Sequence, residues 1–354
     1  MNKKVNIGYH LPSVNTIYAQ RTIYNGFKNA FKDLGNNFFT FTSGVKLENF
    51  LEDNQIDIFI TCSHFSYQNQ LDLKILKKYR EKDLKLFTKV DFWDTPDIKL
   101  RINDARNLKY DKKTINLIKN NILGDVFFHV VEQGDNRMDG FEKGTGFKYY
   151  TIPLAADKIV LKGEFDNNFK ADISYIGTYL PQKKVFFKNY VFPLKKKYKL
   201  KIYGQDWSFL ERISGWVQRG GQYFNVPYIK SMEKPKLSLG DEAKIYKSSL
   251  ISINVHEKYQ IKFGGDCNER TFKILICEGF EITDDVTCIS KYFKDGKEII
   301  IAKNEREWLE KIDYYINNPE KRESIIKAGK EKVLKEHTYH NRVEQILRIY
   351  NNIR

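Results

Sequence analysis

The chain has 354 residues, of which 41% are hydrophobic and 14% aromatic, and this composition excludes an intrinsically disordered chain. Its length allows two domains of ordinary size, each with a core of its own. Sixty Lys and Arg against 45 Asp and Glu give a net charge of +15 at pH 7, but the lysines are scattered in small groups. AT-rich coding bias accounts for this scatter as well as an anionic partner does, so charge alone selects no function.

No stretch approaches the roughly 18 uninterrupted apolar residues of a membrane span. The first residues, MNKKVNIGYHLPSVN, have no continuous apolar segment, so we expect no signal peptide and a cytoplasmic protein. The four cysteines lack the paired short spacing of a zinc or redox motif, and we expect reduced thiols at Cys62, Cys267, Cys277 and Cys288.

Short apolar runs alternate with longer amphipathic stretches through the first half of the chain. The run at 4–8 predicts a strand, and the stretch at 23–35, which ends in a glycine, has apolar residues at helical spacing. Further strands are predicted at 38–42, 57–63, 84–92, 125–131 and 149–154. Alternating strands and helices predict a parallel sheet with helices on both faces.

The alternation starts again after a polar stretch at 155–172 that has no clear period. The second set of predicted strands lies at 173–179, 198–204, 250–256, 280–283 and 298–302. Helices are predicted from about residue 304 to the end, with Pro319 starting one and His337-Thr338 interrupting the next. The fold class is therefore α/β, with two Rossmann-like doubly wound domains that face an interdomain cleft.

Several segments in order carry a resemblance to a known family. They are DISYIGTYLPQKK, LKIYGQDW, AKIYKSSLISINVH, NERTFKILICEGFEITDD and EKVLKEHTYHNR, with GYHLPSVNTIYAQRTIYNGFKNAFKDLG and GFKYYTIPLAAD in the first half. Together they resemble the spore-maturation-protein-type glycosyltransferases, which have the GT-B fold. The order and spacing of the segments make the resemblance more specific than any one of them, and it covers nearly the whole chain.

The resemblance implies an enzyme that moves a sugar from a nucleotide-diphosphate sugar to an acceptor, without a bound metal or other cofactor. It implies an acceptor domain at 1–160, a nucleotide-sugar domain at 166–335, and a last helix at 336–354 that crosses back to the first domain. We expect the acceptor to be a glycan or another glycoconjugate, in surface glycan synthesis. The net charge is also compatible with an anionic membrane surface as a further partner. A nucleic-acid acceptor is a third alternative, and only the net charge supports it.

The segment FGGDCNERTFKILIC predicts a glycine-containing loop that leads into a helix near Asn268 and Glu269. Free amides at a helix start suit a diphosphate, and Gly264 and Gly265 would let the backbone approach it. With the resemblance, Asn268, Glu269, Arg270 and Thr271 become donor-binding candidates. The alternative is an ordinary capped helix, with Asn268 as the cap.

Typical members of the family have a glutamate, placed to bind the ribose, where this chain has Lys273. An ammonium accepts no hydrogen bond from a hydroxyl, so the ribose must be bound otherwise or activity has been lost. Glu269 and Glu278 are candidate substitutes. Loss of activity would leave a binding protein for nucleotide-sugars or carbohydrates.

Other donor-side candidates lie where strands of the second domain end. They are Gly177 and Thr178, then Lys183 (with Lys184 as its alternative), then Tyr203 and Gly204, and finally Asn254 and His256. Trp207 is as readily a core residue as a stacking platform for a base.

On the acceptor side, inverting transfer needs a general base near the acceptor hydroxyl, whereas retaining transfer relies on the donor phosphate and fixed dipoles. The sequence does not separate the two outcomes. The candidate bases follow predicted strands of the first domain, and they are His10, His64, Asp91 and Asp94. Asp91 and Asp94 lack a third ligand, so no metal site is expected.

Overall fold

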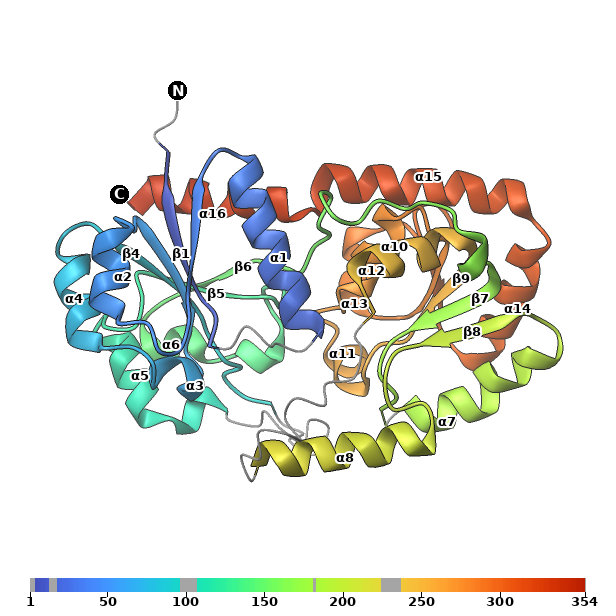
Figure 1. Cartoon of the computed structure of the whole chain (residues 1–354), viewed down its shortest axis with the longest axis horizontal. Coiled ribbons are helices and arrows are strands. Elements are labelled where there is room, and N and C mark those ends of the chain that lie inside the picture. The colour runs from blue at the N-terminus through green and yellow to red at the C-terminus, as the bar shows by residue number, and fades with distance from the viewer. Residues whose placement is uncertain (1–3, 13–17, 96–106, 181–182, 224–236, 354) are drawn as a thin grey trace.

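The computed structural model describes residues 4–12, 18–95, 107–180, 183–223 and 237–353. Residues 13–17 and 181–182 of the segments that carry the family resemblance lie outside these ranges. Two α/β domains lie side by side, each built on its own sheet (Figure 1). The two doubly wound parallel sheets predicted from the sequence are therefore confirmed.

The first sheet has six strands in the order β2-β1-β3-β4-β5-β6, and all pairs are parallel. Its strands are β1 (Asn6–His10), β2 (Asn37–Phe41), β3 (Ile58–Cys62), β4 (Lys85–Lys89), β5 (Val126–His129) and β6 (Tyr149–Thr151). The helices between them are α1 (Tyr18–Asp33), α2 (Leu47–Asp53), α3 (Phe65–Gln68), α4 (Leu73–Arg80), α5 (Lys112–Lys119) and α6 (Phe141–Thr145), with 3₁₀ turns η2 (Leu108–Tyr110) and η3 (Asn136–Met138).

Side chains of neighbouring strands pack on both faces of this sheet. Phe27 and Phe31 of α1 pack with Ile7, Ile58 and other strand residues on one face. The helices α2 and α4 pack against Phe59 and Leu86 on the other face. Burial on both faces explains why these strands read as nearly continuous apolar runs.

The second sheet has five strands in the order β11-β10-β9-β7-β8. They are β7 (Ala171–Ile176), β8 (Leu200–Tyr203), β9 (Ser249–Asn254), β10 (Glu281–Asp284) and β11 (Ile300–Ala302). The remaining elements are η4 (Asn167–Phe169), α7 (Lys184–Phe186), η6 (Phe187–Val191), η7 (Phe192–Lys196), α8 (Phe209–Tyr223), α10 (Leu239–Ser248), α11 (Lys258–Phe263), α12 (Arg270–Ile276), α13 (Thr287–Tyr292), α14 (Glu305–Ile316), α15 (Pro319–Glu336) and α16 (Tyr339–Ile353).

The last helix packs on the first domain. Val343 and Ile346 of α16 belong to the same buried cluster as Phe27 of α1, and Figure 1 shows α16 reaching across to the first domain. The turn before it is tied to residues 153–156, since Arg342 Nε donates to the Pro153 carbonyl at 2.9 Å and Ala156 pairs with Thr338. The chain therefore crosses between the domains twice at neighbouring points.

A buried ion cluster joins the domains at the strand ends. Arg137 is fully buried, and its Nη2 lies 2.6 Å from Asp135 Oδ2 in the first domain and 2.5 Å from Asp266 Oδ1 in the second. Beside it, the Glu132 amide donates to the Gly265 carbonyl at 2.8 Å. The loop after β5 and the loop before α12 thus meet across the domain boundary.

We expect Gly26→Ala to lower the free energy of unfolding by about 1–3 kcal/mol, as overpacking does, although alanine is the better helix former. An added Cβ would lie 2.1 Å from Tyr339 Cδ2, where α1 packs on α16. Denaturant unfolding of both proteins measures the difference. In a Tyr339→Leu background the same change should cost clearly less, and an equal cost in both backgrounds would contradict this packing.

Candidate functional site

Each sheet has one point where the strand order reverses, and ligands of such folds bind outside the strand ends there. In the second sheet the chain passes from β7 to β8 on one side and then to β9 on the other. In the first sheet the same reversal lies between β1 and β3. The ends of β7 and β9 are therefore the expected place for a donor, and the ends of β1 and β3 for an acceptor.

Arg270 at the start of α12 connects the ends of β7 and β9. Its guanidinium donates to the Ile176 carbonyl at 2.9 Å and the Val255 carbonyl at 3.0 Å, and also to Asn254 Oδ1 at 3.1 Å and the Tyr175 hydroxyl at 3.2 Å. All four acceptors are neutral. Arg270 is thus a structural residue of the strand ends as well as a donor-binding candidate.

Lys183 brings a second cation to the same point. Its Nζ donates to the Val255 carbonyl at 2.6 Å and lies 3.3 Å from the Tyr175 hydroxyl, and the side chain is buried. Burial lowers the pKa of Lys183, and the charge of Arg270 lowers it further. Burial raises the pKa of Tyr175, but the charges of Arg270 and Lys183 outweigh burial and bring it below its ordinary value.

These two cations have no carboxylate partner in the described ranges. Lys273 of the same domain, by contrast, is paired with the carboxylate of Glu242. A bound anion at Lys183 and Arg270 would compete only with neutral oxygens. Lys183 and Arg270 therefore place two cationic side chains side by side at the ends of β7 and β9.

Asn254 at the end of β9 orients the start of α12. Its Nδ2 donates to Thr271 Oγ1 at 3.0 Å and Glu281 Oε1 at 2.7 Å, while its Oδ1 accepts from Asn268 Nδ2 at 2.9 Å. Burial raises the pKa of Glu281 to about 8, although the hydrogen bond from Asn254 acts to lower it. Oε2 of Glu281 has no hydrogen-bond partner among the described residues. The site thus rests on a buried carboxyl group that is neutral through much of the physiological range.

His256 follows β9 and is held by a carboxylate on the next strand. Its Nδ1 lies 2.5 Å from Asp284 Oδ1, and its amide donates to Asp284 Oδ2 at 2.9 Å. His256 is buried, and among the described residues Nε2 has no hydrogen-bond partner. Asp284 therefore fixes the orientation of the imidazole ring.

The glycines at the ends of β7 and β8 serve close packing. A Cβ on Gly177 would lie 2.3 Å from Arg270 Nη1, and a Cβ on Gly204, which has φ +122°, would lie 2.3 Å from the Gly177 carbonyl oxygen. Thr178 is half-buried beside them. Tyr203 contacts Phe169, and Trp207 donates to the Gly177 carbonyl at 2.7 Å while packing on Phe187, so Trp207 is a core residue.

The glycine loop does not have the role expected from the sequence. Gly265 faces the first domain, since a Cβ there would lie 1.9 Å from Asp135 Oδ2, and Gly264 is the left-handed cap of α11. Asn268 Oδ1 accepts a hydrogen bond from the Arg270 amide at 3.1 Å, as the capping alternative predicts. Glu269 is half-buried and directly precedes Arg270, the first residue of α12. Anion binding must therefore rest on side chains more than on a glycine-rich backbone.

Two other expected residues lie apart from this group. Glu278 is at the opposite end of α12, where Lys247 Nζ lies 2.5 Å from its Oε2 and Lys330 binds its other oxygen. Lys273 is buried and its Nζ lies 2.6 Å from Glu242 Oε2. Lys273 is therefore paired with a carboxylate of another helix, Glu242 on α10. Arg21 of the first domain lies 3.8 Å from the other carboxylate oxygen of Glu242.

On the first domain, His10 lies at the reversal point but is enclosed. Its Nδ1 is 2.9 Å from Thr61 Oγ1, its Nε2 is 3.4 Å from Gln70 Oε1, and the rings of Phe41 and Tyr67 pack on it. Burial lowers the pKa of His10 to about 4. It is therefore neutral at pH 7 but covered, which disfavours direct contact with an acceptor in this conformation.

The other acceptor-side candidates follow β3 and β4. His64 caps α3 through Ser66, and Asp91 Oδ2 accepts from Ser63 Oγ at 3.1 Å. Asp94 is held by Lys109 Nζ at 2.6 Å and by Asn107. His64, Asp91 and Asp94 are all half-buried.

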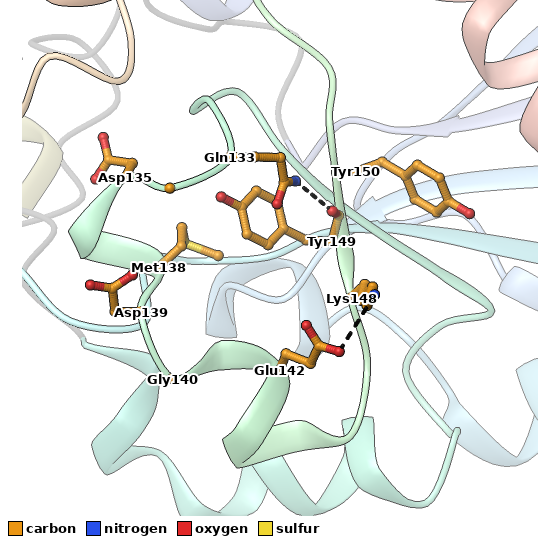
Figure 2. A pocket seen from close by; sticks show the side chains of 10 residues that line it. Gln133, Asp135, Met138, Asp139, Gly140, Glu142, Lys148, Tyr149 and Tyr150 are labelled. Atoms are coloured by element: carbon orange, nitrogen blue, oxygen red, sulfur yellow. Dashed lines mark hydrogen bonds and ion pairs between the residues drawn. The ribbon is translucent and has the colours of Figure 1, made fainter.

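A pocket of about 450 Å³ lies elsewhere on the first domain, between the edge strand β6 and α6 (Figure 2). Gln133 Nε2 donates to the Tyr149 carbonyl at 2.8 Å at its rim. None of the residues predicted from the sequence lines it. The lining residues are Gln133, Gly134, Asp135, Met138, Asp139, Gly140, Glu142, Lys148, Tyr149 and Tyr150.

The described residues contain no group of three His, Cys, Asp or Glu side chains placed to hold a metal ion. Within the same ranges, no helix has the length and apolar character needed to cross a membrane.

Several residues of the site were not predicted. Tyr175 and Glu281 are single residues within apolar strands, and their spacing gives no signal. Asp284 directly follows the last apolar residues of its strand, where strand-end reasoning could have found it. Glu242 lies in a helix and pairs across space, which no local pattern reveals.

Residues 186–348 match a protein-family model described as glycosyl transferase-like. This segment includes Asn254, His256 and Arg270 but neither Lys183 nor the first domain. A comparison with curated proteins returns no match.

Solved structures resemble the whole chain. Sucrose-phosphate synthase from Thermosynechococcus elongatus superposes with a TM-score of 0.62 at 9% identity, over 99% of both chains. An alpha-glucosyltransferase in complex with UDP-glucose and DNA has a TM-score of 0.64 at 11% identity, over 98% of this chain and 99% of that one. HepE from Anabaena, in complex with UDP and glucose, has a TM-score of 0.58 at 10% identity over the same shares. The GT-B fold is confirmed.

We expect Glu281→Gln to change how stability depends on pH. Because the folded-state pKa of Glu281 lies near 8 and the ordinary value is 4.5, its contribution is fully present below about pH 4.5 and is lost as pH rises through 8. The variant should match the parent at pH 5 and exceed it at pH 9 by roughly 2–4 kcal/mol. Denaturant unfolding across this range measures it, with exposed Glu305→Gln as the control. Parallel profiles for Glu281→Gln and the parent would contradict the assignment.

Proposed function

We propose that the chain is a glycosyltransferase that transfers a sugar from a nucleotide-diphosphate sugar to an acceptor hydroxyl. The observation that carries this proposal is the convergence of Arg270 and Lys183 on the Val255 carbonyl at the reversal point of the second sheet. The GT-B fold and the glycosyl transferase-like match support it.

The two cations suit both binding and departure of a diphosphate. Burial lowers the pKa of Lys183 and the charge of Arg270 lowers it further, so a phosphate oxygen that replaced a carbonyl partner here would favour the charged lysine. As the sugar leaves, negative charge grows on the diphosphate, and fixed cations in a buried site stabilise that charge. His256 Nε2 and Glu269 are the neighbouring groups that we propose contact the rest of the donor.

A uridine nucleotide is the first donor to test, since two of the structural neighbours were solved with UDP or UDP-glucose. Lys273 accepts no hydrogen bond and is already paired with Glu242, so it does not bind the ribose. We propose that Glu269 at the start of α12 makes that contact, because it is half-buried and precedes Arg270.

On the acceptor side we propose Asp91 and His64, at the end of the first sheet, as the groups nearest the transferred sugar. The finer features that the family resemblance implies belong to the same proposal. They are membership of the spore-maturation-protein type, cytoplasmic location, metal-independent transfer and an acceptor in a surface glycan or other glycoconjugate.

A DNA acceptor is the second candidate, and a specific pair of observations favours it. The net charge is +15, and several neighbours of the same fold are alpha-glucosyltransferases in complex with DNA. Retention on DNA that falls steeply with salt would favour this acceptor, and no retention would remove it. A non-catalytic binding protein would bind the nucleotide-sugar without hydrolysing or transferring it.

We expect Lys183→Met to abolish the rise in melting temperature that a nucleoside diphosphate or its sugar conjugate causes. The unliganded variant should stay within about 1 kcal/mol of the parent, because the Val255 carbonyl keeps its bond from Arg270 and an unpaired buried cation is removed. Thermal shift with UDP, GDP, ADP, dTDP and their sugars measures both effects.

Lys184→Met is the matched control, since Lys184 is adjacent in sequence and exposed. Arg270→Ala is a poorer probe, because it removes four hydrogen bonds to oxygens at the strand ends and should cost folding stability too. An equal ligand shift in Lys183→Met and the parent would refute this placement of the donor.

A further inference from the structure

Helix α8 exposes an apolar face to solvent. The exposed fractions are 65% for Phe209, 77% for Leu210, 37% for Ile213, 63% for Trp216 and 50% for Val217. At about 100° per residue, these five positions fall within an arc of about 120° around the helix axis. They form one continuous stripe, which we call the α8 stripe.

Over residues 209–217, α8 is amphipathic in the reverse sense of α1 and α16. Glu211, Arg212 and Gly215, on the opposite side of the helix, are half-buried, and the Arg212 guanidinium lies 5.3 Å from the Tyr179 ring centroid. In α1 and α16, by contrast, the apolar residues lie in the buried core. The polar side of α8 therefore meets the protein and the apolar side meets solvent, which marks an interaction surface.

The neighbouring segment is strongly basic. Residues 184–217 contain eight Lys and Arg and two Asp and Glu. The exposed lysines of this segment are Lys184, Lys188, Lys195, Lys196, Lys197 and Lys199. Phe192 of η7 packs on Trp207 with ring centroids 6.2 Å apart, directly before α8, and Figure 1 shows α7 and α8 along the same edge of the molecule.

We infer that the α8 stripe is a docking surface for an anionic lipid membrane, with α8 lying in the plane of the headgroups. An apolar stripe with a tryptophan, flanked by lysines, has the chemistry of a helix that binds at a membrane interface without crossing it. The lysines add attraction to anionic lipid and the stripe adds burial of apolar surface. This inference stands apart from the donor site and does not depend on the proposed function.

The test is flotation of the full chain with vesicles of phosphatidylcholine alone and of phosphatidylcholine mixed with phosphatidylglycerol. Binding should appear with the anionic vesicles, and high salt should weaken it because exposed charges are screened. Leu210→Ser with Trp216→Ser should lower the partition coefficient at least about tenfold, since two apolar side chains no longer enter the lipid. Lys195→Glu with Lys196→Glu should also lower it.

Tyr110→Ser with Leu334→Ser is the matched control, because both side chains are exposed outside the stripe, at 73% and 42%. Circular dichroism melts should show all variants folded, since every replaced side chain is on the surface. Trp216→Phe should still float but lose much of the vesicle-induced blue shift in tryptophan emission. Replacement of a tryptophan that lies away from the lipid would leave this blue shift unchanged.

Three results would overturn the inference. One is no flotation with anionic vesicles, and another is equal flotation of the parent and the Leu210→Ser, Trp216→Ser variant. The third is a concentration-dependent dimer in sedimentation that this variant abolishes while flotation is absent, which would make a second copy the occupant of the stripe.

Discussion

The half-buried side chain of Arg270 makes the interactions on which the second domain's strand ends depend. Two of its four hydrogen bonds go to main-chain carbonyls, that of Ile176 at the end of β7 and that of Val255 directly after β9. One side chain thus fixes the separation of the two strand ends. Gly177 is the residue that leaves room for it. Because all four acceptors are neutral, the structural role and an anion-binding role are compatible in one residue.

Buried ion pairs and apolar packing hold the first domain against the second. Arg137 lies between two carboxylates, one from each domain, and α16 packs into the core of the first sheet. Breaking a buried ion pair on one side leaves an unpaired charge, which is costly, so the loops that carry Asp135 and Asp266 are held together. The loop after β5 and the loop before α12 consequently meet at the domain boundary.

The fold was largely predictable from the sequence because buried parallel strands read as short apolar runs between amphipathic helices. The positions of Arg270, Asn254 and His256 followed from strand-end reasoning and the family resemblance. The failures involved pairing across space: the glycines at 264 and 265 meet Asp135 and Thr287, and Lys273 meets Glu242 on another helix. A local pattern identifies a glycine or a lysine, but the partner that explains it lies far along the chain.

The buried cations of the described residues differ in their partners, and some of them, such as Arg322 and Arg342, donate to main-chain carbonyls without a carboxylate. Arg137 has two carboxylates and Lys273 has one, so each is complete within the folded chain. Lys183 and Arg270 share a carbonyl, and burial lowers the pKa of Lys183. A fold gains nothing in stability from two adjacent cations without a counter-charge, since each raises the cost of the other. The juxtaposition of these two cations is the observation on which the proposed diphosphate site rests.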